Sequence, residues 1–293
     1  MKPSLDSIKV LYSDWSEYEL LDSGDYKKLE RFGKRVVVRS EPKAWWHPEQ
    51  PDRAWQQAQA VCDSEGKWHY KKGLSAEWLL HYDDLTLQAR ITEMSKHVGV
   101  FPEQSPHWEW IKEQSKVTSR RPLRLLSLFG YTGVASLIAA SAGFTVTHLD
   151  ASKPAINWAK QNQEISGMQA APIRWILDDT VKFVNREIRR GSRYDAIIMD
   201  PPAFGRGPKQ EVWKVEKQLV PLLDSCRQIL CDDPIFVIIT MYAIEASPLM
   251  IGNLLADMMK YQGNIELGEL AIKPERGKRI LPMSIFGRWS KTI

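Results

Sequence analysis

The fold is decided by residues 123–133, which read Leu-Arg-Leu-Leu-Ser-Leu-Phe-Gly-Tyr-Thr-Gly. The first six residues suit a buried strand, and Gly130 and Gly133 permit a tight turn after it. Asp150 directly follows the next strand-like run, residues 144–149. A carboxylate and a turn at the ends of neighbouring strands predict a nucleotide-type pocket at the carboxyl edge of a parallel sheet.

The sequence around this stretch alternates strand-like and helix-like segments. Ser105 can cap a helix and Pro106 suits its first position, so a helix is expected over residues 108–116. Further strands are expected at residues 173–177, 194–199 and 235–240, and helices at residues 132–142, 152–166, 179–190 and 209–230. This alternation predicts an α/β fold with a mostly parallel, doubly wound sheet.

The first hundred residues have a different texture. Eight of the twelve tryptophans precede Ile111, and short strand-like pieces alternate with turn residues. Strands are expected at residues 8–12, 18–21, 35–39, 67–70, 77–82 and 85–91. We therefore expect two domains: a small β-rich accessory or substrate domain over residues 1–95, and the α/β domain over residues 96–293.

Composition narrows the class of protein only mildly. Forty basic and 36 acidic residues give a formal net charge of +4, which allows anionic partners without requiring them. Cys62, Cys226 and Cys231 have no metal-ligand spacing, so we expect neither a metal site nor a disulfide framework. No segment reaches the roughly 18 apolar residues of a membrane helix. These features predict a reducing, cytoplasmic location without membrane insertion.

The glycine turn separates two cofactor classes. A dinucleotide site needs G-x-G-x-x-G for close approach of the pyrophosphate, but Phe129 and Tyr131 replace close-approach glycines here. S-adenosylmethionine has no phosphate and tolerates bulkier turn residues. Asp150 would accept hydrogen bonds from its ribose, and Asp179 would accept one from its adenine amine. The alternative is that both acids merely begin helices, where carboxylates are favoured.

The set of motifs resembles a known family. Residues 129–133, Asp150-Ala151-Ser152, Asp179 and residues 200–204 are similar to class I S-adenosylmethionine-dependent methyltransferases related to the bacterial 23S ribosomal RNA large-subunit enzymes. The resemblance extends from about Lys96 to the end of the chain and implies a seven-stranded, Rossmann-like sheet. It places Phe129, Gly130, Tyr131, Thr132, Gly133, Asp150, Ala151, Ser152, Asp179 and Asp200 at the cofactor, and it implies that Phe101 and Gln104 face it from residues 96–104. The amino-terminal region is much less similar.

One departure from the family bears on the reaction. The family's cytosine-C5 enzymes attack the ring with a cysteine just after the fifth strand, but residues 238–242 contain none. Methylation of a nitrogen needs only positioning and removal of water. Asp200 and the Pro201 carbonyl would hold that nitrogen while Phe204 stacks on a flipped base. This resembles the Asp/Asn-Pro-Pro-aromatic motif of amino-methyltransferases, with the ring one position later. The alternative is that the two prolines only shape the chain after the strand and that Phe204 packs in the core.

Three clusters of basic residues bear on the identity of the methyl acceptor. They are Arg120, Arg121 and Arg124; Arg186, Arg189, Arg190 and Arg193; and Lys273, Arg276, Lys278 and Arg279. Such groups contact phosphates, and Trp45 or Trp46 could stack on unpaired bases. Alternatively, the clusters are solvated faces and the tryptophans belong to the core.

The preferred function is methylation of a base in RNA, with ribosomal RNA implied by the resemblance. The alternatives are a small-molecule or protein methyltransferase, and an RNA-binding protein without catalysis.

Overall fold

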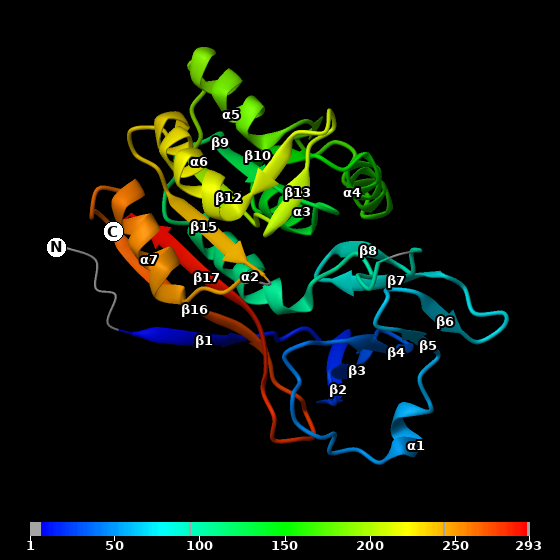
Figure 1. Cartoon of the computed structure of the whole chain (residues 1–293). Coiled ribbons are helices and arrows are strands. Elements are labelled where there is room, and N and C mark those ends of the chain that lie inside the picture. The colour runs from blue at the N-terminus through cyan, green and yellow to red at the C-terminus, as the bar shows by residue number, and fades with distance from the viewer. Residues whose placement is uncertain (1–6, 94, 243, 292–293) are drawn as a thin grey trace. The chain divides into compact units, whose positions relative to one another are not determined.

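The computed structural model describes residues 7–93, 95–242 and 244–291 (Figure 1). The chain divides into two compact units that are discontinuous in sequence. The large unit comprises Met1–Leu11, His107–Leu270 and Ser284–Ile293, and the small unit comprises Tyr12–Pro106 and Ala271–Met283. The domain boundary expected after residue 95 stays a prediction, and the chain ends that it includes, residues 1–6 and 292–293, lie outside the described residues.

The main sheet has eight strands and is mostly parallel, as the sequence predicted. Its order is β1 (Ile8–Tyr12), β16 (Asn264–Ile272), β17 (Leu281–Ser290), β15 (Phe236–Met241), β12 (Ala196–Met199), β9 (Leu123–Leu128), β10 (Phe144–Asp150) and β11 (Ile173–Leu177). The five strands from β15 to β11 pair in parallel, and β17 pairs antiparallel to β15.

The eighth strand is β1, which the sequence assigned to the amino-terminal module. It extends the sheet beside β16 instead. Gly268 permits this approach, because a Cβ at that position would lie 1.9 Å from the Lys9 carbonyl oxygen. The expected count of seven strands was therefore one too low.

The strand order reverses direction once, between β9 and β12. From β9 the chain adds β10 and β11 on one side, and then returns to place β12 and β15 on the other. In open parallel sheets, ligands bind at the carboxyl ends of the strands at such a reversal. The turn at residues 129–133 and the segment at residues 200–204 lie at the ends of these two strands.

Helices cover both faces of the sheet. They are α2 (Ser105–Gln114), α3 (Val134–Ser141), α4 (Lys153–Ile165), α5 (Thr180–Arg189), α6 (Val215–Ile229) and α7 (Pro248–Met258). Residues of α5, α6 and α7 share one core cluster with Ile197, Val237 and Ile239. On the opposite face, the Trp110 ring of α2 lies 5.2 Å from the Phe236 ring. Among the described residues, no helix is long and apolar enough to cross a membrane.

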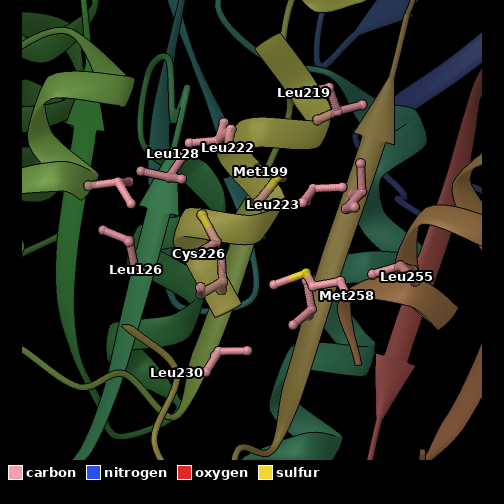
Figure 2. Packing of buried hydrophobic residues seen from close by; sticks show 14 of the residues in the cluster. Leu126, Leu128, Met199, Leu219, Leu222, Leu223, Cys226, Leu230, Leu255 and Met258 are labelled. Carbon is pink, nitrogen blue, oxygen red and sulfur yellow. The ribbon is translucent and has the colours of Figure 1, made fainter. Parts of the chain in front are cut away.

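One core cluster of the large unit lies beneath α6. Its apolar side chains at Leu219, Leu222, Leu223 and Cys226 recur at the spacing of one helix face and point at the sheet (Figure 2). They are between 0% and 4% exposed. This packing fixes β12, and therefore the start of residues 200–204, against β9 and β15.

The segment before α6 differs from the sequence prediction. A helix was expected over residues 209–230, but the helix begins at Val215 and follows a hairpin of β13 (Phe204–Arg206) and β14 (Val212–Lys214). The Gln218 side chain accepts a hydrogen bond from the Lys214 N–H at 2.7 Å, which caps the helix start. Pairing with β13 therefore overrides the helical pattern of residues 209–214.

The small unit is β-rich, as predicted. One sheet contains β2 (Tyr18–Gly24), β3 (Lys27–Phe32), β4 (Arg35–Ser40), β5 (Ala60–Cys62) and β6 (Trp68–Tyr70), and a hairpin pairs β7 (Glu77–Tyr82) with β8 (Leu85–Arg90). The short helices α1 (Asp52–Trp55) and η1 (Pro102–Gln104) complete it. The sequence missed β3 and β5, and the β4–β5 pair is parallel rather than antiparallel.

The strand β3 was missed because two of its four buried side chains, Lys28 and Glu30, are charged. Arg39 donates two hydrogen bonds to the fully buried Glu30 carboxylate, at 2.6 and 2.7 Å. Although burial would raise the pKa of Glu30, the Arg39 guanidinium holds it at about 2. Only this pairing makes Glu30 compatible with the interior of a sheet.

Candidate cofactor and acceptor site

The turn after β9 has an unusual backbone. Phe129 and Tyr131 have φ values of 56° and 51°, and Gly133 has 82°. Left-handed backbone at two aromatic residues is sparsely populated and is retained where the surroundings enforce it. The Tyr131 ring lies 6.2 Å from the Trp158 ring of α4, and the Thr132 carbonyl accepts a hydrogen bond from the Asn162 amide. Contacts with α4 therefore hold the turn in this conformation.

Gly130 is required by close packing beneath the turn. A Cβ at this position would lie 2.3 Å from Cε1 of His148 and 2.9 Å from Oγ of Ser127. The His148 ring is fully buried and cannot withdraw easily, since Nδ1 lies 2.8 Å from the Ser136 hydroxyl and the Trp175 ring lies 4.7 Å away. Burial lowers the pKa of His148 to about 3, so the ring is neutral near pH 7.

Asp150 ends β10 beside this turn, as the sequence predicted. One carboxylate oxygen accepts the Tyr131 N–H at 2.9 Å, and the other accepts the Ser152 N–H at 2.8 Å. Burial raises the pKa of Asp150, and these N–H groups oppose that rise. Each oxygen keeps further lone pairs for a ligand's hydroxyls. Ser152 itself caps α4 by accepting the Ala155 N–H at 3.3 Å.

Asp179 follows the neighbouring strand β11. Its Oδ1 atom accepts the Lys182 N–H at 2.9 Å, so it caps α5, as the helix-start alternative predicted. The adjacent Asp178, which the sequence did not single out, pairs with Arg186. The capping bond uses one oxygen of Asp179. Binding of an adenine amine therefore stays a prediction for this residue.

Asp200 and the two prolines follow β12, the strand on the other side of β9. The Asp200 N–H donates to the Leu128 carbonyl at 3.4 Å, and this bond links the ends of β12 and β9. The Asp150 carbonyl accepts the Asp178 N–H at 3.2 Å, which links β10 to β11 in the same way. The large unit thus brings the predicted residues at 129–133, 150–152, 179 and 200–204 to one edge of its sheet.

Trp213 of β14 connects the turn at residues 129–133 to the segment at residues 200–204, and it was not singled out from the sequence. Its indole N–H donates to the Pro202 carbonyl at 2.7 Å, and its ring centroid lies 4.9 Å from that of Phe129. The side chain is 5% exposed. Trp213 therefore fixes the position of the Pro-Pro segment relative to the turn. The signal that could have identified Trp213 is a tryptophan that follows a Pro-Pro motif at a sequence separation that a short hairpin can span.

Phe204 starts β13 with its side chain turned outward. It is 54% exposed, which contradicts the alternative that this ring packs in the core. Lys214 lies opposite it on β14, whereas Gly205 and the buried Trp213 form the neighbouring pair. Side chains alternate between the two faces of a strand. The inward Trp213 ring therefore leaves the Phe204 ring accessible.

The environments of the cysteines are those of unreactive thiols: Cys62 and Cys226 are buried, and Cys231 is half-buried. All three are free. Cys226 is fully buried in the core under α6, and burial raises its pKa well above that of an ordinary thiol (Figure 2). Burial and the neighbouring Asp195 carboxylate, which accepts from its Sγ, raise the pKa of Cys231. Neither environment favours a thiolate.

Phe101 and Gln104 belong to the small unit. Phe101 precedes η1, and its ring lies 5.1 Å from the His97 ring. Their predicted contact with a cofactor stays a prediction.

Sequence comparison identifies the family. Residues 28–235, well over half of the chain, match the model of the S-adenosylmethionine-dependent methyltransferase family. The chain belongs to this family. It is an S-adenosylmethionine-dependent methyltransferase, and S-adenosylmethionine is its cofactor.

Individual relatives agree with this assignment. Over 114 residues the chain is 30% identical to ribosomal RNA large subunit methyltransferase K of Neisseria meningitidis, covering 38% of this chain and 32% of that protein. It is 33% identical over 103 residues to ribosomal RNA large subunit methyltransferase I of Klebsiella pneumoniae, covering 34% and 26%. The matched part spans about a third or less of these relatives.

Solved structures match over nearly the whole chain. The S-adenosylmethionine-dependent methyltransferase from Agrobacterium tumefaciens is 44% identical, with a TM-score of 0.94 and coverage of 99% and 96% of the two chains. The methyltransferase SMU.776, solved in complex with SAH, is 17% identical with a TM-score of 0.73, covering 94% of this chain and 76% of its own. The second likeness concerns the fold alone.

Proposed function

We propose that this methyltransferase transfers a methyl group to a nitrogen of a base in RNA. The observation that carries the proposal is the Asp200–Phe204 segment, which combines a carboxylate at the end of β12 with an aromatic ring that is 54% exposed. The buried Trp213 holds this segment beside the turn at residues 129–133.

The residues of the turn fit a nucleoside that carries an amino acid and no phosphate. Phe129 and Tyr131 crowd the approach that a pyrophosphate would need, whereas the Asp150 carboxylate suits ribose hydroxyls. Asp150 would bind the ribose, Asp179 would accept from the adenine amine with its second oxygen, and the backbone of residues 129–133 would line the amino-acid moiety. S-adenosylmethionine supplies an activated sulfonium methyl group when it is bound.

The acceptor would be held by the segment after β12. Asp200 and the Pro201 carbonyl would accept hydrogen bonds from the amine hydrogens, which orients the nitrogen lone pair at the methyl carbon. The same two acceptors would take up the proton that the amine loses when it is methylated. The Phe204 ring would stack on the base after it has left its helix.

The thiols support nitrogen rather than cytosine C5 as the target. Carbon methylation at C5 requires transient attack by a thiolate, and the strand end after β15 carries no cysteine. Cys226 lies in the core, and Cys231 has a raised pKa. Nitrogen is already a nucleophile, so the positioning groups suffice.

RNA is favoured over a small molecule or a protein by the relatives. The curated proteins that match are named ribosomal RNA large subunit methyltransferases K, K/L and I. The exposed Phe204 ring in the same segment as the Asp200 carboxylate also suits a base that has been flipped out of its helix.

Methyl transfer from labelled S-adenosylmethionine tests this proposal. Total RNA and total protein from cells that lack the enzyme serve as acceptors, and mass spectrometry of nuclease-digested RNA identifies the modified nucleoside. We expect label in one N-methylated nucleoside. Asp200→Ala should lower kcat at least 100-fold while the Kd for S-adenosylmethionine changes less. Label confined to protein, a C5-methylated nucleoside, or normal turnover by Asp200→Ala would contradict it.

A further inference from the structure

The three arginine- and lysine-rich clusters differ sharply in their surroundings. In the first, Arg120 pairs with Asp195 at 2.8 Å, and Arg121 donates to the Ser115 carbonyl. In the second, Arg186 pairs with Asp178, and Arg190 pairs with Glu187 at 2.9 Å. These four cations therefore already have acceptors within the large unit. They are poor candidates for phosphate binding.

The third cluster lies in the small unit, on the connection between β16 and β17. Lys273, Arg276 and Lys278 are exposed, and within the described part of the chain none of them forms an ion pair. The segment also holds Arg279, which pairs with Glu49, and the exposed Glu275. Four cations and one acid leave a formal charge of +3 in residues 273–279. We call this segment the basic loop.

Two exposed aromatic rings lie on two other segments of the same unit, Tyr26 in the turn between β2 and β3 and Trp45 in residues 41–50. Trp45 is 76% exposed and Tyr26 is 60% exposed. The Trp45 indole N–H donates to the Pro42 carbonyl at 2.6 Å, so one edge of the ring is fixed while most of its surface faces solvent. The Tyr26 N–H donates to the Ala44 carbonyl at 2.8 Å. The backbone of the turn that carries Tyr26 is thereby bonded to residues 41–50, which carry Trp45 and which we call the aromatic loop.

The aromatic loop is rigidly supported. The Asp22 carboxylate accepts the N–H groups of Glu49 and Gln50 at 3.2 and 2.7 Å. The Trp46 indole, which points inward, donates to the Ser23 carbonyl at 2.8 Å. Neighbouring tryptophans therefore have different roles: Trp46 anchors the loop, and Trp45 projects from it. A ring that is ordered before binding loses little entropy when a ligand stacks on it.

Direct contacts join the two loops. Arg279 donates to the His47 carbonyl, the Lys278 N–H donates to Glu49 at 3.2 Å, and the Lys43 ammonium donates to the Met283 carbonyl. In Figure 1 the connection between β16 and β17, coloured orange to red, accordingly runs beside the blue loop. Trp45 lies within two residues of Lys43 and of His47. The exposed Trp45 ring and the exposed cations thus lie on two loops that are in direct contact.

We propose that this surface, formed by Tyr26 and Trp45 with Lys273, Arg276 and Lys278, binds a single-stranded segment of RNA outside the catalytic site. Single strands are bound by basic grooves that follow the phosphates and by aromatic rings on which bases stack, and the small unit supplies both. Isolated exposed apolar side chains are ordinary on protein surfaces. Two exposed rings and three exposed cations, carried by segments that hydrogen bonds join, instead match the flat bases and the charge of a nucleic acid. The assignment rests on the proposed RNA substrate and gives the small unit the role of holding it.

The test is equilibrium binding of a fluorescein-labelled twelve-residue oligouridine to the full chain, followed by anisotropy at several salt concentrations. We expect Trp45→Ala and Tyr26→Ala each to weaken binding at least fivefold, because one stacked base is lost. Trp45→Phe should remain within about twofold of the wild type. The triple variant Lys273→Ala/Arg276→Ala/Lys278→Ala should lower the slope of log K against log salt by about 2, since a single strand contributes about 0.7 per phosphate contact.

Matched controls keep the test specific. Lys34, Lys160 and Lys217 are exposed lysines elsewhere on the chain, and their triple alanine variant removes the same charge. Tyr261 is 51% exposed in the large unit, so Tyr261→Ala controls for loss of an exposed ring. Circular dichroism and calorimetric binding of S-adenosylmethionine should be unchanged in every variant.

Equal effects of the two charge variants, or wild-type affinity of Trp45→Ala, would overturn the proposed surface. Selective binding of duplex RNA with no dependence on Trp45 would do so too. These outcomes are separate from the proposed function. Label transferred to protein would refute the RNA substrate even if oligouridine binds here, whereas label in RNA with no effect of the variants would refute this surface alone.

Discussion

Trp213→Phe should separate the positioning role of the indole from its packing role. Phenylalanine keeps a ring beside Phe129 but removes the N–H that donates to the Pro202 carbonyl at 2.7 Å. Pro202 is exposed, so its carbonyl can bond to water instead. The free energy of unfolding should fall by about 1–3 kcal/mol, from the net contribution of one hydrogen bond and the lost packing of the smaller ring.

A separate effect is expected on turnover. The segment from Asp200 to Phe204 would lose one of its attachments to the hairpin, and displacement of reacting groups by about 1 Å can lower a rate about 100-fold. We expect kcat with the true acceptor to fall at least tenfold. The Kd for S-adenosylmethionine should stay within about twofold, because the turn at residues 129–133 keeps its aromatic neighbour. Trp213→Ala should lower the free energy of unfolding by about 3–5 kcal/mol, since it empties a buried site.

Urea unfolding, calorimetry with the cofactor and initial-rate methylation measure these three quantities. Trp289→Phe is the matched control. Trp289 is also buried, at 4% exposed, and its N–H also donates to a backbone carbonyl, that of Gln262, but on β17. Trp289→Phe should lower the free energy of unfolding by a similar amount and leave kcat unchanged. A normal kcat in Trp213→Phe would refute the positioning role, and a parallel rise in the cofactor Kd would show that the residue acts through the turn.

Three further predictions concern individual residues. Phe204→Ala should raise KM for the acceptor at least tenfold, with little change in stability because the ring is 54% exposed. Phe204→Tyr keeps an aromatic ring and should retain acceptor binding. Equal steady-state kinetics in the wild type and both variants would exclude stacking. Gly130→Ala should destabilise the protein by about 1–3 kcal/mol and weaken cofactor binding, because its Cβ would lie 2.3 Å from His148; thermal unfolding that matches the wild type would show that the ring moves aside. His148 has a folded pKa of about 3 and an ordinary value near 6.5, so the unfolded chain binds its proton first and stability falls as pH drops through this window. Between pH 6 and pH 4, the free energy of unfolding of His148→Gln should therefore depend on pH less steeply than that of the wild type, by about 1.4 kcal/mol per pH unit, and an identical slope in urea titrations would contradict the burial argument.

Local sequence determined the parallel core and the acidic strand ends. The run at residues 123–128 and the glycines after it predict a strand and a turn without reference to the rest of the chain, because apolar periodicity and backbone freedom are local properties. Asp150 and Asp200 could be placed at one edge for the same reason: parallel strands bring their carboxyl ends together.

Tertiary contacts decided what lies around that edge. The sequence pattern of residues 209–214 predicts a helix, yet Trp213 lies in a β-hairpin. The hairpin is favoured because the Trp213 ring packs beside Phe129 and its indole N–H donates to the Pro202 carbonyl. The β1 strand joins the large sheet because Gly268, far along the chain, leaves room for it. Glu30 and Arg39 are buried only because they pair across neighbouring strands. Each outcome depends on contacts with another element of the chain, and no local pattern specifies which element will be near.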